Sequence, residues 1–326
     1  MYMFISRWWR IISPWPAILV FVAIGRTLDV PNMEIAIEGA KLGDALITSG
    51  KGRITREQIL SDYGKFQARQ YLIQREAPSD AATVIESYIK EEIFFAFKQK
   101  KIRCDIRSLR RLPSGRKYDM YWQQSFDGEK TMLLRLDATG PKGLIEPMGS
   151  IKSGNDIPQA RDPRYWGMTI FGTPVKEFLE GRPFGICSIP IGKPLLLKSV
   201  QLDGVLCDVV RTKLSRDYTI TVWLARTKAY RPKRIEVADP NGQVITIVSN
   251  TFRSYGGDLW FPKQVVAEKY AIDKVTGKRE LHSRTTLIVH DDFMVNIDLP
   301  DEMFEIRFPK GLEVYDFRIG KTFIAE

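Results

Sequence analysis

From about residue 87 to the end of the chain, apolar and polar side chains alternate with a period of two. This is the pattern of half-buried β-strands. Runs of this kind occupy residues 88–111, 116–137 and, most clearly, 217–226 (DYTITVWLAR). The apolar positions that share one side of this last run are Tyr218, Ile220, Val222 and Leu224. Trp223 falls on the opposite side. The pattern predicts a mainly β protein.

Turn signals separate these runs. Asp127-Gly128 is typical of a tight hairpin, because its turn needs positive φ values that Asp and Gly tolerate. Residues 239–242 (DPNG) have the order that a type I turn prefers. Further corners are predicted at Gly256-Gly257 and at residues 273–278. Short connections between alternating strands predict antiparallel neighbours, and the C-terminal half reads as a meander without crossover helices or parallel strands.

Two segments depart from the strand period. Within residues 29–50, Asn32 is a candidate N-cap and the apolar residues fall on one stripe, which predicts an amphipathic helix. Residues 157–181 are rich in large apolar side chains but lack the period of two. There Thr173 and Pro174 suit the start of a short helix and Gly181 its end. This second segment is predicted to be a plug or a lid on one face of the sheet.

The domain organisation follows from these elements. Residues 32–326 are predicted to form a single β domain, with insertions near 75–98 and 140–181. The length, together with a composition of 44% hydrophobic and 11% aromatic residues, suits a globular chain with a substantial core.

The first 25 residues differ from the rest. They carry Arg7 and Arg10, no acidic residue, and an apolar run over residues 17–24 that ends in a small-x-small arrangement. The run is shorter than the roughly 20 residues that span a bilayer. Residues 1–25 are therefore predicted to be a secretory signal peptide, with an uncleaved N-terminal anchor as the alternative. Either one predicts an exported protein.

Lys and Arg exceed Asp and Glu, which gives a formal net charge of +10. A basic run occupies residues 98–111. A solvated strand face explains this run, and contact with anionic lipid headgroups is the alternative. The residues proposed for such membrane contact are Lys98, Lys100, Lys101 and Arg103. Export argues against nucleic acid as the partner.

Catalytic signatures are sparse. The two histidines are His282 and His290, and residues 289–293 (VHDDF) read more readily as a polar strand end than as metal ligands. Residues 319–322 (IGKT) lack the upstream Gly of a phosphate-binding loop. Three cysteines match no disulfide or zinc spacing, so buried free thiols are expected. The sequence therefore predicts no enzyme, no metal site and no cofactor.

Aromatic residues are the remaining candidates for chemistry. They lie across the strands and the inserted segment, where core packing is the ordinary explanation. The alternative is that several line an apolar cavity between a curved sheet and the inserted segment. The candidate lipid-binding residues are Trp122, Trp166, Met168, Phe171, Phe178, Trp223 and Trp260.

The C-terminal stretch MFEIRFPKGLEVYDFR, residues 303–318, resembles the final strand and tail of the LolA-like group, the periplasmic carriers that sort lipoproteins to the outer membrane. The matching positions are Phe304, Ile306, Pro309, Gly311, Val314 and Asp316. SFDGEKTMLL and KAYRPKRIEVADPNGQVI are similar to further strands of this group and of its larger bacterial relatives. The chain is much longer than the lipoprotein carriers proper, and the early-strand Arg that holds their lid has no evident counterpart.

This resemblance implies an open, curved antiparallel sheet, a half-barrel, whose concave face is covered by an N-terminal helix and a short lid helix. It also implies a periplasmic carrier that holds a lipid acyl chain or a lipoprotein between sheet and lid. The alternative is a ligand-free structural or interaction module of the cell envelope.

Overall fold

The structure is a computed structural model that describes residues 32–74, 86–112, 116–140, 143–157, 161–170, 173–182, 191–214, 217–273 and 275–326. The predicted signal peptide lies outside these residues. The helices are α2 (Met33–Ala45), α3 (Asp62–Gln74) and α4 (Val175–Leu179), with single 3₁₀ turns η3 (Pro163–Tyr165), η5 (Arg226–Lys228) and η6 (Asp301–Phe304).

The strands of the first half are β1 (Ser49–Leu60), β2 (Tyr88–Lys98), β3 (Lys101–Arg111), β4 (Lys117–Phe126), β5 (Lys130–Gly140), β6 (Gly143–Ile145), β7 (Met148–Ser153), β8 (Thr169–Ile170) and β9 (Thr173–Pro174). Those of the second half are β10 (Leu195–Leu202), β11 (Val205–Lys213), β12 (Thr219–Ala225), β13 (Arg231–Ala238), β14 (Val244–Ser254), β15 (Trp260–Ile272), β16 (Arg279–Val289), β17 (Met294–Val295), β18 (Glu313–Asp316) and β19 (Lys321–Ile324).

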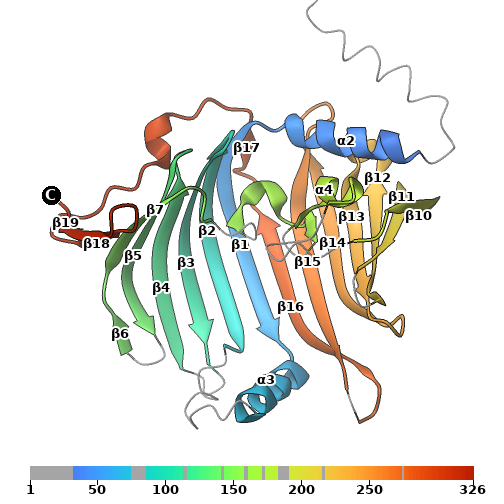
Figure 1. Cartoon of the computed structure of the whole chain (residues 1–326), viewed down its shortest axis with the longest axis horizontal. Helices are drawn as coiled ribbons and strands as arrows, with labels where there is room; N and C mark the ends of the chain where they lie inside the picture. Colours follow the sequence, from blue (N-terminus) through green and yellow to red (C-terminus); the bar gives the residue numbers. More distant parts are fainter. Residues whose placement is uncertain are drawn as a thin grey trace, which may run out of the picture.

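In the described part of the chain, every strand except β8 and β9 belongs to one open, curved sheet (Figure 1). Strand β1 lies in its middle, paired with β2 on one side and with β16 and β17 on the other. From β1 the order runs through β2, β3, β4, β5 and β7 to one edge. In the other direction β16 to β10 follow as a continuous antiparallel meander. The predicted half-barrel is confirmed.

One pairing is parallel. After β17 the chain leaves the meander and returns to the far edge, where β18 pairs with β7 in parallel and with β19 in antiparallel fashion. The sequence predicted no parallel strands, because a long connection that crosses the sheet without a helix leaves no periodic signal.

The turns form where they were predicted, although at Asp127-Gly128 only the glycine has a positive φ. The Asp127 side chain accepts hydrogen bonds from the backbone N–H groups of Glu129 and Lys130, both at 2.9 Å, and closes the β4–β5 hairpin. Gly128 has a φ of 110°, which an L side chain rarely adopts. The β13–β14 turn is closed by a 2.9 Å bond from Gly242 N–H to the Asp239 carbonyl.

Both predicted helices are present, with one shift. Asn32 caps α2 by accepting bonds from Glu34 and Ile35 N–H. Helix α4 begins at Val175, so Pro174 is its N-cap and not its first residue. Helix α3 was not predicted, because it has no strong apolar stripe. Its cap is Ser61, whose hydroxyl accepts a 2.9 Å bond from Gly64 N–H.

The concave face is the face that carries α2, η3 and α4. Its apolar side chains form two clusters, one under η3 on β1–β4, β15 and β16, and one under α2 and α4 on β11–β14. Ile220, Val222 and Leu224 of the clearest predicted strand are fully buried in the second cluster. The period of two therefore identified the buried face of β12 correctly.

The convex face is covered in part by the C-terminal tail, residues 297–326. Phe304 packs on Ala96 of β2, and Ile306 and Val314 pack on Met132 and on neighbouring side chains of β5 and β7. Since alternate residues of β2 point to opposite faces, the end of this strand around Ala96 is covered on both sides, whereas Phe94 on the convex face is exposed. The predicted insertion near 75–98 includes β2, which pairs with β1 and β3 along its whole length.

Candidate functional site

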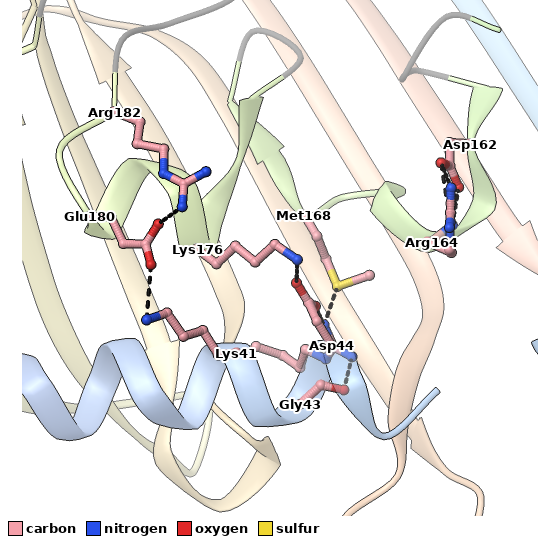
Figure 2. Close-up of polar contacts among 10 residues, drawn as sticks. Lys41, Gly43, Asp44, Asp162, Arg164, Met168, Lys176, Glu180 and Arg182 are labelled. Atoms are coloured by element: carbon pink, nitrogen blue, oxygen red, sulfur yellow. Dashed lines mark hydrogen bonds and ion pairs between the residues drawn. The ribbon is translucent and has the colours of Figure 1, made fainter. Parts of the chain in front are cut away.

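The candidate site lies between the concave face and a segment that we name the lid: η3, β8, β9 and α4, within residues 161–182, of which 171 and 172 are not described. In Figure 1 this segment crosses the concave side of the sheet below α2. Figure 2 shows that polar side chains of the lid pair with polar side chains of α2. We call this line of contacts the rim.

The underside of the lid is apolar. The Trp166 ring meets the Phe95 ring of β2 edge to face, with centroids 5.1 Å apart. Phe178 of α4 is fully buried among Val210, Ile220 and other side chains of the second concave cluster. Met168 is 4% exposed. The lid therefore fills much of the space that the sequence assigned to a ligand.

The candidate lipid-binding residues do not all lie on the same face of the sheet. Trp122, Trp166, Met168 and Phe178 are all buried, Trp122 on the concave side of β4 and the other three on the lid. Trp223 and Trp260 are each next in sequence to a residue of a concave cluster. Because successive side chains of a strand point to opposite faces, these two tryptophans point to the convex face. There Trp223 contacts Arg234, and Trp260 lies 5.0 Å from the Lys228 amine. Phe171 lies outside the described residues.

A buried arginine joins the sheet to α2. Arg231 of β13 donates to Asp44, to the Gly43 carbonyl at 2.7 Å and to the Met168 sulfur at 3.3 Å. Lys176 of α4 reaches the same Asp44 carboxylate at 3.1 Å (Figure 2). One carboxylate thus connects a strand, α2 and the lid.

A second connection lies nearer to solvent. Lys41 of α2 pairs with Glu180 at 3.0 Å, and Arg182 pairs with the same carboxylate at 2.7 Å (Figure 2). The bond from Lys41 lowers the pKa of Glu180, and in return Glu180 raises the pKa of Lys41. Both groups stay charged at neutral pH, so the contact is an exposed ion pair of small net stabilisation.

The other end of the lid is fixed to the β2–β3 hairpin. Arg164 forms a two-pronged contact with Asp162 and donates to the Gln99 carbonyl. Burial works against the charged form of Arg164, but its hydrogen bonds to the Asp162 carboxylate and the negative charge of that group outweigh burial and raise the pKa of Arg164. Such planar, paired contacts hold geometry more firmly than a lysine does.

A cavity of about 240 Å³ opens beside these contacts. Its lining includes Asp44, Ile47, Tyr165, Lys176 and Phe261, and so it mixes charged and apolar groups. Ligand pockets for molecules of drug size begin at roughly 300 Å³. A long acyl chain does not fit this volume while the lid is in place.

The basic run contacts the protein's own tail. Lys98 lies 3.4 Å from Asp298, and Lys101 lies 2.8 Å from Asp301. Arg103 pairs with Asp105 and donates to the carbonyls of residues 303 and 305. These three cations stabilise the tail on the convex face, and their charges are largely matched there.

The polar strand end at residues 289–293 is structural. His290 Nε2 lies 2.8 Å from the Thr55 hydroxyl, and Asp291 and Asp292 pair with Arg253 and Arg53. Among the described residues no three His, Cys, Asp or Glu side chains are grouped as metal ligands.

The described cysteines, Cys104 and Cys207, are free and buried, as expected, and burial raises the pKa of Cys207 to about 11. Cys187 lies outside the described residues. Within the described part of the chain, no helix combines the length and apolar character needed to cross a bilayer.

Sequence reasoning missed Asp44, Lys176 and Arg231. Each is a single charge inside a segment that was interpreted by its apolar residues. The only available signal was Arg231, a charged residue at the start of a strand with an apolar residue on either side of it. Charged residues at such positions are usually solvated, so this signal did not indicate a buried contact. Their convergence depends on tertiary structure.

No family model matches this chain, and no curated protein matches it. Its fold is similar to several solved structures. A DUF1329 family protein from Desulfovibrio piger is 11% identical, with a TM-score of 0.40 over 85% of this chain and 98% of that one. A LolA superfamily protein from Nitrosomonas europaea is 13% identical, with a TM-score of 0.36 over 85% of this chain and 99% of that one.

A putative outer membrane lipoprotein-sorting protein domain from Vibrio parahaemolyticus is also 13% identical, with a TM-score of 0.35 over 84% of this chain and 97% of that one. At these TM-scores and identities the similarity does not extend to function, which has to be argued from the site.

Proposed function

We propose that this protein is an exported carrier of the cell envelope that binds the acyl chain of a lipid or lipoprotein between its concave face and the lid. The observation that carries the proposal is the chemistry of the lid. Its underside is apolar, and its rim is held by a few polar contacts that converge on Asp44 and Glu180.

Displacement of the lid by a chain is energetically reasonable. Burial of each methylene contributes about 0.8 kcal/mol, so a long chain replaces much of the apolar contact that the lid gives up. The rim contacts are ion pairs, of which the exposed ones contribute roughly 0–1 kcal/mol each. The ligand would select a state in which the lid is open.

Apolar side chains extend the proposed path. Ile191, Leu196, Leu214 and Tyr218 are partly exposed and pack against the second concave cluster. They continue the apolar surface from α4 toward the β10 edge of the sheet. A chain that enters under the lid finds further apolar contact there.

A ligand-free interaction module is the second candidate, and one observation favours it. Trp166 and Phe178 already fill the concave face, as packing residues do. The proposal does not include membrane contact through the basic run. Of the four cations proposed for such contact, only Lys100 is without an acidic partner among the described residues.

The test is Asp44→Asn, which removes two ion pairs at the rim and keeps the side-chain shape. With the full chain expressed in a Gram-negative host, we expect lipid to co-purify with the wild type in native mass spectrometry. We also expect the variant to take up a fluorescent fatty acid several-fold faster, because its lid opens more often. Lys176→Gln, which removes only the lid's side of this contact, should act in the same direction.

Glu38→Gln is the matched control. Glu38 lies on the same helix, but its carboxylate is exposed and pairs only with Lys41, at 3.1 Å. It should leave uptake unchanged. If the wild type and Asp44→Asn are both lipid-free and neither takes up the probe, the carrier proposal is wrong and the interaction module stands.

A further inference from the structure

A second polar group lies on the concave face, beside the lid and away from Asp44. The guanidinium groups of Arg161 and Arg110 lie 5.3 Å and 5.8 Å from the centre of the Trp122 ring. Arg56 of β1 projects from the same face of the sheet, opposite Glu91 of β2. Two arginines thus lie against one buried indole, and a third projects from the same face of the sheet two strands beyond Arg110.

The carboxylates in this group do not match its cations. Arg56 pairs with Glu91, and Arg110 pairs with Glu86, both at 2.6 Å. Arg161 donates a 3.0 Å hydrogen bond to the neutral amide of Gln124 and has no acidic partner within the described ranges. Burial lowers the pKa of Arg161, as do the charges of Arg56 and Arg110, while Glu91 opposes them. One positive charge is left over.

Two buried N–H donors in the same place are unused. Trp122 is 5% exposed, and its indole Nε1 has no hydrogen-bond partner among the residues that the structure describes. Arg135 is paired with Trp122 across β4 and β5, and its Nε is likewise buried without a partner. A buried donor without a partner is destabilising, and such groups in a native structure call for an explanation.

We propose that Arg161, Trp122 and Arg135 form a site for a single oxyanion, the carboxylate or phosphate headgroup of the ligand whose chain lies under the lid. An oxyanion beside the indole supplies the missing negative charge and accepts from all three donors. Trp122 belongs to the same apolar cluster as Trp166 and Phe95. Headgroup and chain would therefore bind at adjacent positions. This inference rests on the proposed carrier function and names its ligand class as an anionic amphiphile.

The first experiment compares three ligands with the same twelve-carbon chain: dodecanoate, dodecyl phosphate and the neutral methyl dodecanoate. Binding to the full chain is measured by isothermal titration calorimetry. We expect an anionic ligand to bind about tenfold more tightly than the ester, since a hydrogen-bonded charge pair is worth this much or more. Arg161→Gln should remove that preference and leave the affinity for the ester unchanged.

Arg107→Gln is the matched control. Arg107 belongs to the basic run and lies on β3, but its side chain is exposed on the convex face, over the Tyr121 ring. It should leave both affinities unchanged. Trp122→Phe keeps an aromatic ring and removes the N–H. It should therefore weaken the binding of the anion several-fold without changing the affinity for the ester. Whichever anion binds more tightly identifies the headgroup.

The outcomes separate the two proposals. If ester and anions bind equally and Arg161→Gln changes neither, the carrier function stands and the headgroup site is wrong. If no chain binds, the carrier function is wrong, and inorganic phosphate alone then tests the site. If phosphate binds and Arg161→Gln abolishes this binding, a free-anion site is supported. If phosphate does not bind, the proposed site is wrong as well.

Discussion

Single charged residues hold this fold together at points where several elements meet. Arg231 contacts α2, the lid and its own strand through one guanidinium. Gly43 and Gly39 make this approach close, because a Cβ on Gly39 would lie 2.2 Å from the Tyr230 ring. Asp316 is a charged residue that stabilises the tail. Its carboxylate accepts hydrogen bonds from Arg318 Nε at 2.9 Å and Nη2 at 2.6 Å.

Asp316 gives a pH-dependent prediction. The hydrogen bonds from Arg318 lower its pKa in the folded protein. Its contribution to stability is therefore complete above the ordinary value of about 3.9 and is lost as the pH falls through the lower folded value. We expect the urea midpoints of the wild type and Asp316→Asn to differ at pH 6 and to converge toward pH 2. A difference that stays constant with pH would contradict this account.

At the scale of elements, the tail and the lid cover opposite faces of the same strands. The tail is ordered because β2, β5 and β7 present apolar residues on the convex side, which Phe304, Ile306 and Val314 cover. The lid is ordered by the corresponding residues on the concave side. Both segments carry ion pairs. The difference is that the tail adds strands β18 and β19 to the edge of the main sheet, whereas the lid strands β8 and β9 pair with each other.

Phe304→Ala tests how firmly the tail is held. The side chain is fully buried against Ala96 and Leu299, so its loss should lower the free energy of unfolding by about 3–5 kcal/mol. Urea denaturation measures this change. Phe317→Ala is the control, because Phe317 is 54% exposed, and we expect a change below about 1 kcal/mol. Equal effects of the two substitutions would mean that the tail is not packed as described.

At the scale of the whole molecule, β1 joins two meanders into one sheet. It pairs with β2 over eleven residues and with β16 over seven. Both halves therefore depend on one strand from the beginning of the domain. The edges are formed by β10 on one side and by the short β19 on the other, and β19 is exposed along its length.

Hydrogen exchange followed by mass spectrometry tests this arrangement. Amides of β1 should exchange most slowly, because their release requires both meanders to separate, and those of β10 and β19 should exchange fastest among the strands. We also expect α4 to exchange faster than α2, since the lid opens in the proposed function. Slow exchange confined to β10–β14 would instead indicate two independent units.

Much of the strand content could be predicted from the sequence because its causes are local. Alternation identified the buried face of β12, and Asp-Gly and Pro-Asn-Gly identified turns, since these depend on neighbouring φ values and side-chain bonds. The aromatic candidates were less well separated. Trp223 was assigned to the site together with Trp122, although its alternation with Val222 already placed it on the other side of its strand.

The sequence by itself thus determined strands β2–β5 and β12–β16, the turns between them, the capped helix α2 and the tail motif, because each depends on residues close together in the chain. It did not reveal the central strand β1. Tertiary structure alone decided that β18 joins β7 in parallel, that the end of β2 is covered on both faces, and that Asp44, Lys176 and Arg231 meet. It likewise placed Arg110, Arg135 and Arg161 around one indole. These contacts join residues far apart in sequence, and only the curvature and register of the whole sheet bring them together.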